Sequence, residues 1–112
     1  MASIDELWLV DFGPPYPGEP ASRRPALVLG PPDTFGAGFP LVILAPLTTT
    51  HRQLSLHVEV QANTATGLRH TSYVQCESIR SVNTRRLLHK IGTIDANTSL
   101  QVDTIVRTLL NH

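Results

Sequence analysis

The sequence predicts a small, mostly β domain, a curled antiparallel barrel closed by one C-terminal α-helix. Short apolar runs alternate with turns rich in proline and glycine, a pattern typical of small all-β folds. The final stretch changes period, because Val102, Ile105, Val106 and Leu109 fall at i, i+3, i+4 and i+7, on one stripe of a helix. The length of 112 residues suits one domain, so residues 1–112 are expected to fold as a single unit.

The strands follow from the apolar runs and from the breakers that end them. Residues 41–45 form the most apolar run and are the best candidate for a central strand, ending at Pro46. Residues 56–60 alternate strictly, which puts His57 and Glu59 on an exposed face. The full set of expected strands is residues 7–12, 26–29, 41–45, 56–60, 73–82 (one long strand or two joined at a bend) and 87–94.

The closing helix is expected over residues 97–110, with Asp95 or Asn97 as its N-cap. Residues 13–22 hold four prolines and two glycines and form a loop that is long for so small a domain. Loops of this kind usually carry function.

Composition narrows the class of protein. Hydrophobic residues make up 41% of the chain, which indicates a globular domain. No apolar run approaches the roughly 20 residues that span a bilayer, and the acidic N-terminus does not read as a signal peptide, so the cytoplasm is the expected compartment. The single cysteine, Cys76, excludes an internal disulfide framework. Its apolar setting favours a buried thiol over a nucleophile.

The charge is uneven although its formal sum is zero. Residues 69–90 carry four arginines and Lys90 against one acid, Glu77. Arginine makes forked contacts to phosphate, so this stretch is either a nucleic-acid surface or an ordinary solvated face. Trp8 and Tyr73 are expected to be core or barrel-rim aromatics, with base stacking as the alternative.

Familiar cofactor and metal motifs are missing from the sequence. There is no phosphate-binding GxxxxGK[ST] loop, no GxGxxG and no paired-cysteine zinc spacing. The five histidines share no ligand spacing, so neither a metal site nor a cofactor is expected.

One pair of residues points to phosphate chemistry. A proline-rich loop delivers Arg23 and Arg24 to the start of the run at residues 26–29, and the fold fixes Arg24 while Arg23 points the other way. The run at residues 41–45 is followed by Pro46, Leu47 and Thr48, which delivers a hydroxyl. A guanidinium and a hydroxyl on neighbouring strand ends make a phosphate-sized donor pocket.

Taken in order, these segments resemble the MazF (PemK-like) toxin ribonucleases of bacterial toxin–antitoxin pairs. The likeness runs from about residue 7 to residue 110. It is carried by residues 8–12 (WLVDF), 18–28 (GEPASRRPALV) and 75–82 (QCESIRSV).

The resemblance implies a Src-homology-3-like barrel of the CcdB/PemK type that forms a homodimer. It implies metal-independent cleavage of single-stranded RNA at short sequence motifs, by 2′-hydroxyl attack that leaves a 2′,3′-cyclic phosphate and a 5′-hydroxyl. Such toxins arrest growth by blocking translation, and the partner implied is an antitoxin with an acidic, apolar, disordered tail. The catalytic arginine carries over onto Arg24, the threonine onto Thr48 and the acid onto Glu19. Here the loop reads P-G-E where many relatives have G-S-E, which puts the setting of Glu19 in doubt.

The remaining site predictions concern the base and the RNA surface. Glu19 and His51 are the candidates for the general base, because arginine is a poor proton acceptor near neutrality; the alternative is a chain that works slowly without a well-tuned base. The alternatives without a catalytic role are that Glu19 forms an ion pair with Arg23 and that His51 is a solvated turn residue. The residues expected to bind RNA are Arg23, Arg69, Arg80, Arg85, Arg86, His51 and Thr49.

Two other functions compete with the nuclease. One is a non-catalytic barrel-type interaction module, and the other is a CcdB-like gyrase-binding toxin. The pair formed by Arg24 and Thr48 favours the nuclease over both.

Overall fold

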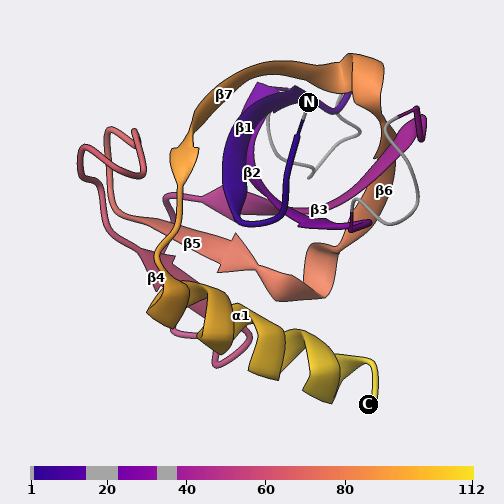
Figure 1. Cartoon of the computed structure of the whole chain (residues 1–112). Helices are drawn as coiled ribbons and strands as arrows, with labels where there is room; N and C mark the ends of the chain where they lie inside the picture. Colours follow the sequence, from indigo (N-terminus) through magenta and orange to yellow (C-terminus); the bar gives the residue numbers. More distant parts are fainter. Residues whose placement is uncertain (1, 15–22, 33–37) are drawn as a thin grey trace.

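The computed structural model describes residues 2–14, 23–32 and 38–112. These residues form a curled antiparallel sheet with one helix against it (Figure 1). The elements are β1 (Glu6–Asp11), β2 (Arg23–Gly30), β3 (Leu41–Thr48), β4 (His57–Val60), β5 (Ser72–Gln75), η2 (Cys76–Ser78), β6 (Arg80–Asn83), η3 (Thr84–Arg86), β7 (Leu87–Thr93) and α1 (Ala96–Leu109). The mostly β fold with a C-terminal helix is therefore confirmed.

The strand order is β4-β5-β3-β2-β1-β7, and β6 pairs with β3 off this path. Strand β3 borders three strands. It pairs with β2 along one edge, and on the other edge its first half pairs with β6 and its end pairs with β5. This confirms the central-strand prediction. Figure 1 shows β1, β2, β3, β6 and β7 curling around a common axis. Within the described ranges no ladder joins β6 to β7, so the barrel is curled without being closed by hydrogen bonds.

Several strand boundaries differ from the sequence prediction, and the largest differences are in β2, which begins at Arg23, and in β3. Strand β3 does not end at Pro46 but continues to Thr48. Its ladder with β6 covers Leu41–Leu44 and its ladder with β5 covers Leu47–Thr48, so Pro46 falls between the two, where a missing amide hydrogen is tolerated. The stretch 73–82 forms two strands joined by η2, which was the second of the two alternatives.

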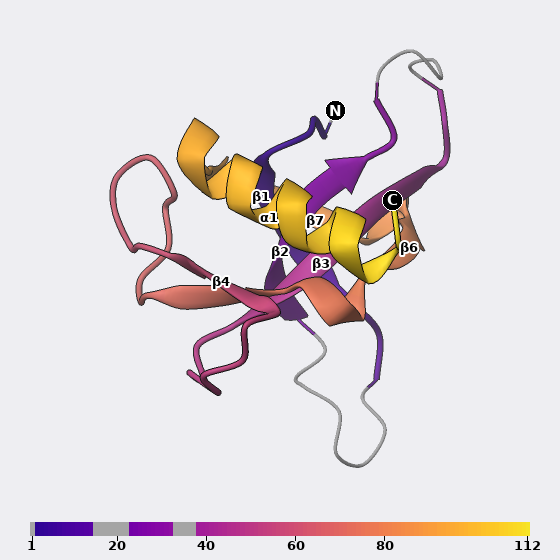
Figure 2. The same ribbon diagram turned by 90° about the horizontal axis from the view of Figure 1, so that it is seen from below.

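The core has two parts, one on each face of the curled sheet. One cluster lies inside the curl and includes Val10, Ala26 and Leu44, all 0% exposed. The other lies between the sheet and α1 and includes Leu27, Leu47, Val58 and Val102. Figure 2 shows α1 lying across the strands on this second face. The face of β4 and β5 away from the helix is thus left for polar side chains.

The helix matches its prediction apart from its last turn. Asp95 is the N-cap, and its Oδ1 accepts the Thr98 N–H at 2.8 Å. The hydrogen bonds from Thr98 lower the pKa of Asp95. Val102, Ile105 and Val106 pack against the sheet as expected, but Leu109 is 41% exposed. With 14 residues, α1 is too short to cross a membrane, and no helix in the described part of the chain could do so.

Gly92 in β7 is required by a close backbone approach. A Cβ at this position would lie 2.3 Å from the Ala65 oxygen and 2.4 Å from the Thr66 oxygen. Ala65 and Thr66 belong to the loop between β4 and β5. This loop is hydrogen-bonded to β7, because the Thr93 N–H donates to the Ala65 carbonyl at 2.9 Å. A side chain at Gly92 would therefore push the loop off the strand.

We expect Gly92→Ala to lower the free energy of unfolding by about 3 kcal/mol, because two backbone oxygens must move. Urea unfolding followed by circular dichroism measures this. Gly38→Ala is the matched control, since a Cβ there meets nothing within 4 Å, and it should change stability by less than about 0.5 kcal/mol. Equal effects of the two substitutions would contradict the close approach.

Candidate active site

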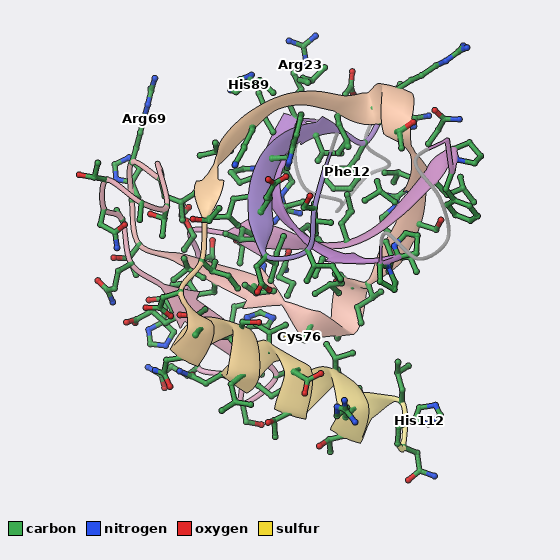
Figure 3. The ribbon with its side chains drawn as sticks, in the orientation of Figure 1. Phe12, Arg23, Arg69, Cys76, His89 and His112 are labelled. Atoms are coloured by element: carbon green, nitrogen blue, oxygen red, sulfur yellow. The ribbon has the colours of Figure 1, made fainter. Side chains whose placement is uncertain are left out.

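Arg24 lies at the start of β2, half-buried at the edge of the cluster inside the curl. It pairs with Val10 of β1, which fixes its backbone. Its Nη2 donates to the Leu47 carbonyl at 2.6 Å and to the Gln75 Oε1 at 2.8 Å. One nitrogen thereby ties β2 to β3 and β5. Arg23, next to it, is exposed and points outward (Figure 3), so the predicted division between the two arginines is confirmed.

The charge on Arg24 has only uncharged ligands within the described residues. Burial lowers the pKa of Arg24, but a guanidinium remains protonated at any physiological pH. The two hydrogens on Nη2 serve the two oxygens, which leaves three N–H donors, on Nε and Nη1, without an acceptor in residues 2–14, 23–32 or 38–112. A half-buried cation with free donors favours an anion that brings several oxygens.

Thr48 lies beside this guanidinium. The Leu47 carbonyl that Arg24 binds belongs to the peptide linking Leu47 to Thr48. The register Ala26↔Pro46, continued by two residues, also places Arg24 opposite Thr48 on one face of the sheet. The Thr48 Oγ1 accepts the Thr50 N–H at 3.1 Å, and its own hydrogen stays available to a ligand. The structure thus brings the Arg24 guanidinium to the Leu47–Thr48 peptide, and a phosphate site shared by the two side chains stays a prediction.

His51 and Tyr73 border Thr48 on its other side. Tyr73 pairs with Thr48 across β3 and β5. The turn fixed by the Thr48 hydroxyl brings His51 back over Tyr73, and the two rings stack with centroids 4.6 Å apart and planes 6° apart. Thr49 and His51 are both exposed beside the site. His51 is therefore an exposed turn residue whose ring is positioned next to Thr48 by stacking on Tyr73.

His57 and Glu77 form a second polar pair near Gln75. His57 lies opposite Gln75 in the β4–β5 ladder, and its Nε2 is 3.0 Å from the Glu77 Oε2. The expectation that His57 lies on an exposed face is wrong, since its side chain is only 2% exposed, whereas Glu59 is exposed as expected. The turn η2 brings Glu77 to the ring. His57 Nδ1 is the one buried side-chain nitrogen or oxygen without a hydrogen-bond partner in the described residues.

Three of the other predicted arginines lie around the end of β1, and one of them, Arg23, points outward. The backbone of Arg23 lies opposite that of Asp11 in the β1–β2 ladder. The Arg86 Nη1 donates to the Asp11 carbonyl at 3.2 Å. The Arg80 guanidinium lies 5.1 Å from the centroid of the Phe12 ring, and Figure 3 shows Phe12 inside the curl. These three arginines form a basic rim around the end of β1.

Two predicted arginines lie elsewhere. Arg69 is exposed on the loop between β4 and β5 and points away from the sheet in Figure 3. Arg85 lines a separate cavity of about 590 Å³ with Trp8, Phe39 and Leu87. The structure does not bring Arg69 or Arg85 into contact with Arg24 or with the residues that bind it. Glu19 falls in residues 15–22, outside the described part of the chain, so its role stays a prediction.

Sequence reasoning missed Gln75 as a ligand of Arg24 and did not pair His57 with Glu77. The signal was present, because an apolar face at Val74 and Cys76 leaves Tyr73, Gln75 and Glu77 on the other face of that segment. Which strand this face meets depends on pairing across the sheet. That pairing is absent from the local pattern.

Metal and thiol chemistry find little support in the described residues. Residues 2–14, 23–32 and 38–112 contain no group of three or more His, Cys, Asp or Glu side chains that could hold a metal ion. Cys76 is 1% exposed, and burial together with the nearby Glu77 raises the pKa of its thiol to about 11. The predicted burial of the thiol is confirmed.

The fold and the site define a class of protein: a small barrel-like domain in which a half-buried arginine is hydrogen-bonded across three strands, with further arginines around the end of β1. Residues 5–110 match the family described as PemK-like, MazF-like toxin of type II toxin–antitoxin system. The chain belongs to this family, as the sequence resemblance indicated.

Relatives and solved structures agree with this assignment. The chain is 30% identical over 116 residues to Endoribonuclease MazF9 of Mycobacterium tuberculosis, covering 99% of this chain and 98% of the relative. It is similar in fold to a crystal structure of MazF from Deinococcus radiodurans, with a TM-score of 0.83, 24% identity, and coverage of 99% and 97%. An endoribonuclease solved in complex with its cognate antitoxin, from a mycobacterial species, gives a TM-score of 0.80 at 20% identity, with coverage of 99% and 96%.

We expect Cys76 to resist alkylation in the folded protein. A pKa of about 11 leaves roughly one thiol in a thousand ionised at pH 8, and burial blocks access to the reagent. Iodoacetamide labelling followed by mass spectrometry should be at least about a hundredfold slower in native buffer than in concentrated urea. Equal rates in the two buffers would show that the thiol is exposed.

Proposed function

We propose that this chain is an endoribonuclease that cleaves single-stranded RNA by attack of the 2′-hydroxyl on the adjacent phosphorus. The products are a 2′,3′-cyclic phosphate and a 5′-hydroxyl. As the toxin of a toxin–antitoxin pair, the protein arrests growth by cutting RNA in the cytoplasm and so blocking translation. The observation that carries this proposal is the half-buried Arg24 guanidinium, held by two uncharged oxygens beside the Thr48 hydroxyl.

The reaction has three requirements: removal of the 2′ proton, stabilisation of the charge on the phosphorane, and a proton for the leaving 5′ oxygen. Arg24 meets the second, because its remaining N–H donors are fixed before the charge develops. Thr48 donates a further hydrogen bond to the same phosphate. The requirement for a 2′-hydroxyl distinguishes RNA from DNA without any reading of bases.

The base is either Glu19 or His51. His51 is supported by its fixed place over Tyr73, whose backbone pairs with Thr48. Glu19 is supported by the family resemblance of residues 18–28.

The basic rim binds the RNA backbone. Arg23, Arg80 and Arg86 lie around the end of β1, and their charges attract the phosphates that flank the cleaved one. In a symmetric homodimer, two such rims meet one RNA strand. The antitoxin is a peptide with acidic and apolar residues that competes for the same rim, and a relative solved with its cognate antitoxin supports a partner of this kind.

We expect Arg24→Ala to lower kcat/KM for a labelled single-stranded RNA by two to three decades, because the fixed donors are worth about 3–4 kcal/mol in the transition state. Arg24→Lys should recover only part of this loss, since lysine keeps the charge without the fork. Arg107→Ala is the matched control: Arg107 pairs with Asp103 on α1 and should leave cleavage unchanged. Intact activity in Arg24→Ala would refute the proposed function.

Thr48→Val tests the hydroxyl while keeping the shape of the side chain. A hydrogen bond to a charged group is worth about 1.5–3 kcal/mol, so kcat should fall about 10- to 100-fold, and Thr48→Ser should restore most of it. The readout is single-turnover cleavage with saturating enzyme. Equal rates for the valine and serine variants would mean that the hydroxyl does not contact the phosphate.

Chelation separates this mechanism from metal-assisted hydrolysis. We expect cleavage in EDTA at the rate seen without it, with every upstream fragment ending in a 2′,3′-cyclic phosphate and every downstream fragment beginning with a 5′-hydroxyl, because the 2′-hydroxyl is the nucleophile. Gel mobility before and after mild acid treatment identifies the cyclic end. Loss of activity in EDTA, restored by a divalent cation, would indicate a metal site instead.

A further inference from the structure

The proposed chemistry uses His51 only as one of two candidate bases and gives no role to the stacking of its ring on Tyr73. Their planes are 6° apart at a centroid distance of 4.6 Å, an arrangement close to ideal for aromatic rings. His51 is exposed and Tyr73 is partly exposed, so the stack forms a flat aromatic surface that reaches solvent. Such surfaces are how proteins bind unpaired nucleobases.

The position of the stack relates it to the cleaved phosphate. Tyr73 pairs directly with Thr48, and the Thr48 hydroxyl fixes the turn that carries His51. Arg24, Thr48 and Tyr73 therefore fall in one row across three adjacent strands. With strands about 4.8 Å apart, the backbones of β2 and β5 lie about 10 Å apart, and the Arg24 side chain reaches across this span to Gln75 on β5. That span is comparable to the reach of one nucleotide from its phosphate to its base.

We propose that the His51–Tyr73 stack is a nucleobase platform: the base of a nucleotide adjoining the cleaved phosphate stacks on it. The inference rests on the proposed function and adds the group that holds the substrate beside the phosphate pocket. Stacking reads the flat face that every base has, so the platform requires an unpaired base without specifying which one. It thereby selects single-stranded over double-stranded RNA, because a paired base keeps its faces inside the helix.

The platform also orients the reaction. A nucleotide held at its base by the rings and at its phosphate by Arg24 has little freedom between the two. This restriction favours the in-line approach of the 2′-hydroxyl, which requires one sugar conformation among many. Removing the rings should thus weaken binding and slow cleavage of a bound strand as well.

The test compares intact and abasic RNA with and without the Tyr73 ring. The probe is a short single-stranded RNA that the wild type cuts, with a 2′-deoxy sugar at the cleaved step so that it binds without reacting. Two further probes each lack the base on one side of that step. Dissociation constants are measured by fluorescence anisotropy for the wild type, Tyr73→Leu and the control Tyr73→Phe, which keeps the ring.

We expect Tyr73→Leu to bind the intact probe about tenfold more weakly than the wild type does, and Tyr73→Phe to bind it as the wild type does. On one of the two abasic probes, the wild type and Tyr73→Leu should bind within about twofold of each other, because the base that needs the ring is gone. An equal loss on all three probes, or no loss on any, would overturn the platform.

Two further measurements separate failure of the platform from loss of folding and from failure of the proposed nuclease function. If Tyr73→Leu lowers the melting temperature of the protein, His51→Leu takes its place, because it replaces an exposed ring. We expect His51→Leu to weaken binding of the intact probe and to bind one abasic probe as the wild type does. If the wild type cuts no RNA, the proposed function fails, and the same titration with oligouridine and its abasic analogue of equal length still decides whether the stack binds bases.

Discussion

The site depends on one nitrogen atom, Nη2 of Arg24, held between the carbonyl of Leu47 and the side-chain oxygen of Gln75. The two acceptors come from β3 and β5, so the guanidinium is positioned only when three strands are correctly paired. Both acceptors are neutral, and the charge they hold is partly removed from water. A cation in such surroundings is stabilised by any anion that reaches it, and the phosphodiester of RNA is an anion with the oxygens to match.

The rest of the fold serves this arrangement. Strand β3 changes partner along its length, from β6 to β5, and Pro46 lies at the change. Beyond it, Leu47 offers its carbonyl to Arg24 and Thr48 offers its hydroxyl. The helix packs on the opposite face through Val102, which leaves the polar face of β4 and β5 open to a ligand. One sheet thus separates a hydrophobic core from the polar surface on which the chemistry is proposed.

The sequence alone predicted the fold and half of the site. The change from apolar runs to a helical stripe located the strands and α1, and the breaker positions beside Arg24 and Thr48 located the two donors. It did not predict Gln75, which is 51 residues from Arg24 and reaches it only through strand pairing. Nor did it separate Arg85, which lines another cavity, from Arg86, which joins the rim. The charge pattern gives the number of arginines but not the side of the sheet each one occupies.

A crystal structure with a short RNA carrying a 2′-deoxy sugar at the cleaved step tests the central claim most directly. The account predicts a phosphate oxygen within hydrogen-bond distance of Nε or Nη1 of Arg24 and of the Thr48 hydroxyl, with the bonds from Nη2 to Leu47 and Gln75 kept. An RNA bound with its phosphates away from Arg24, or a guanidinium that leaves Gln75 to follow the RNA, would contradict a pocket formed in advance.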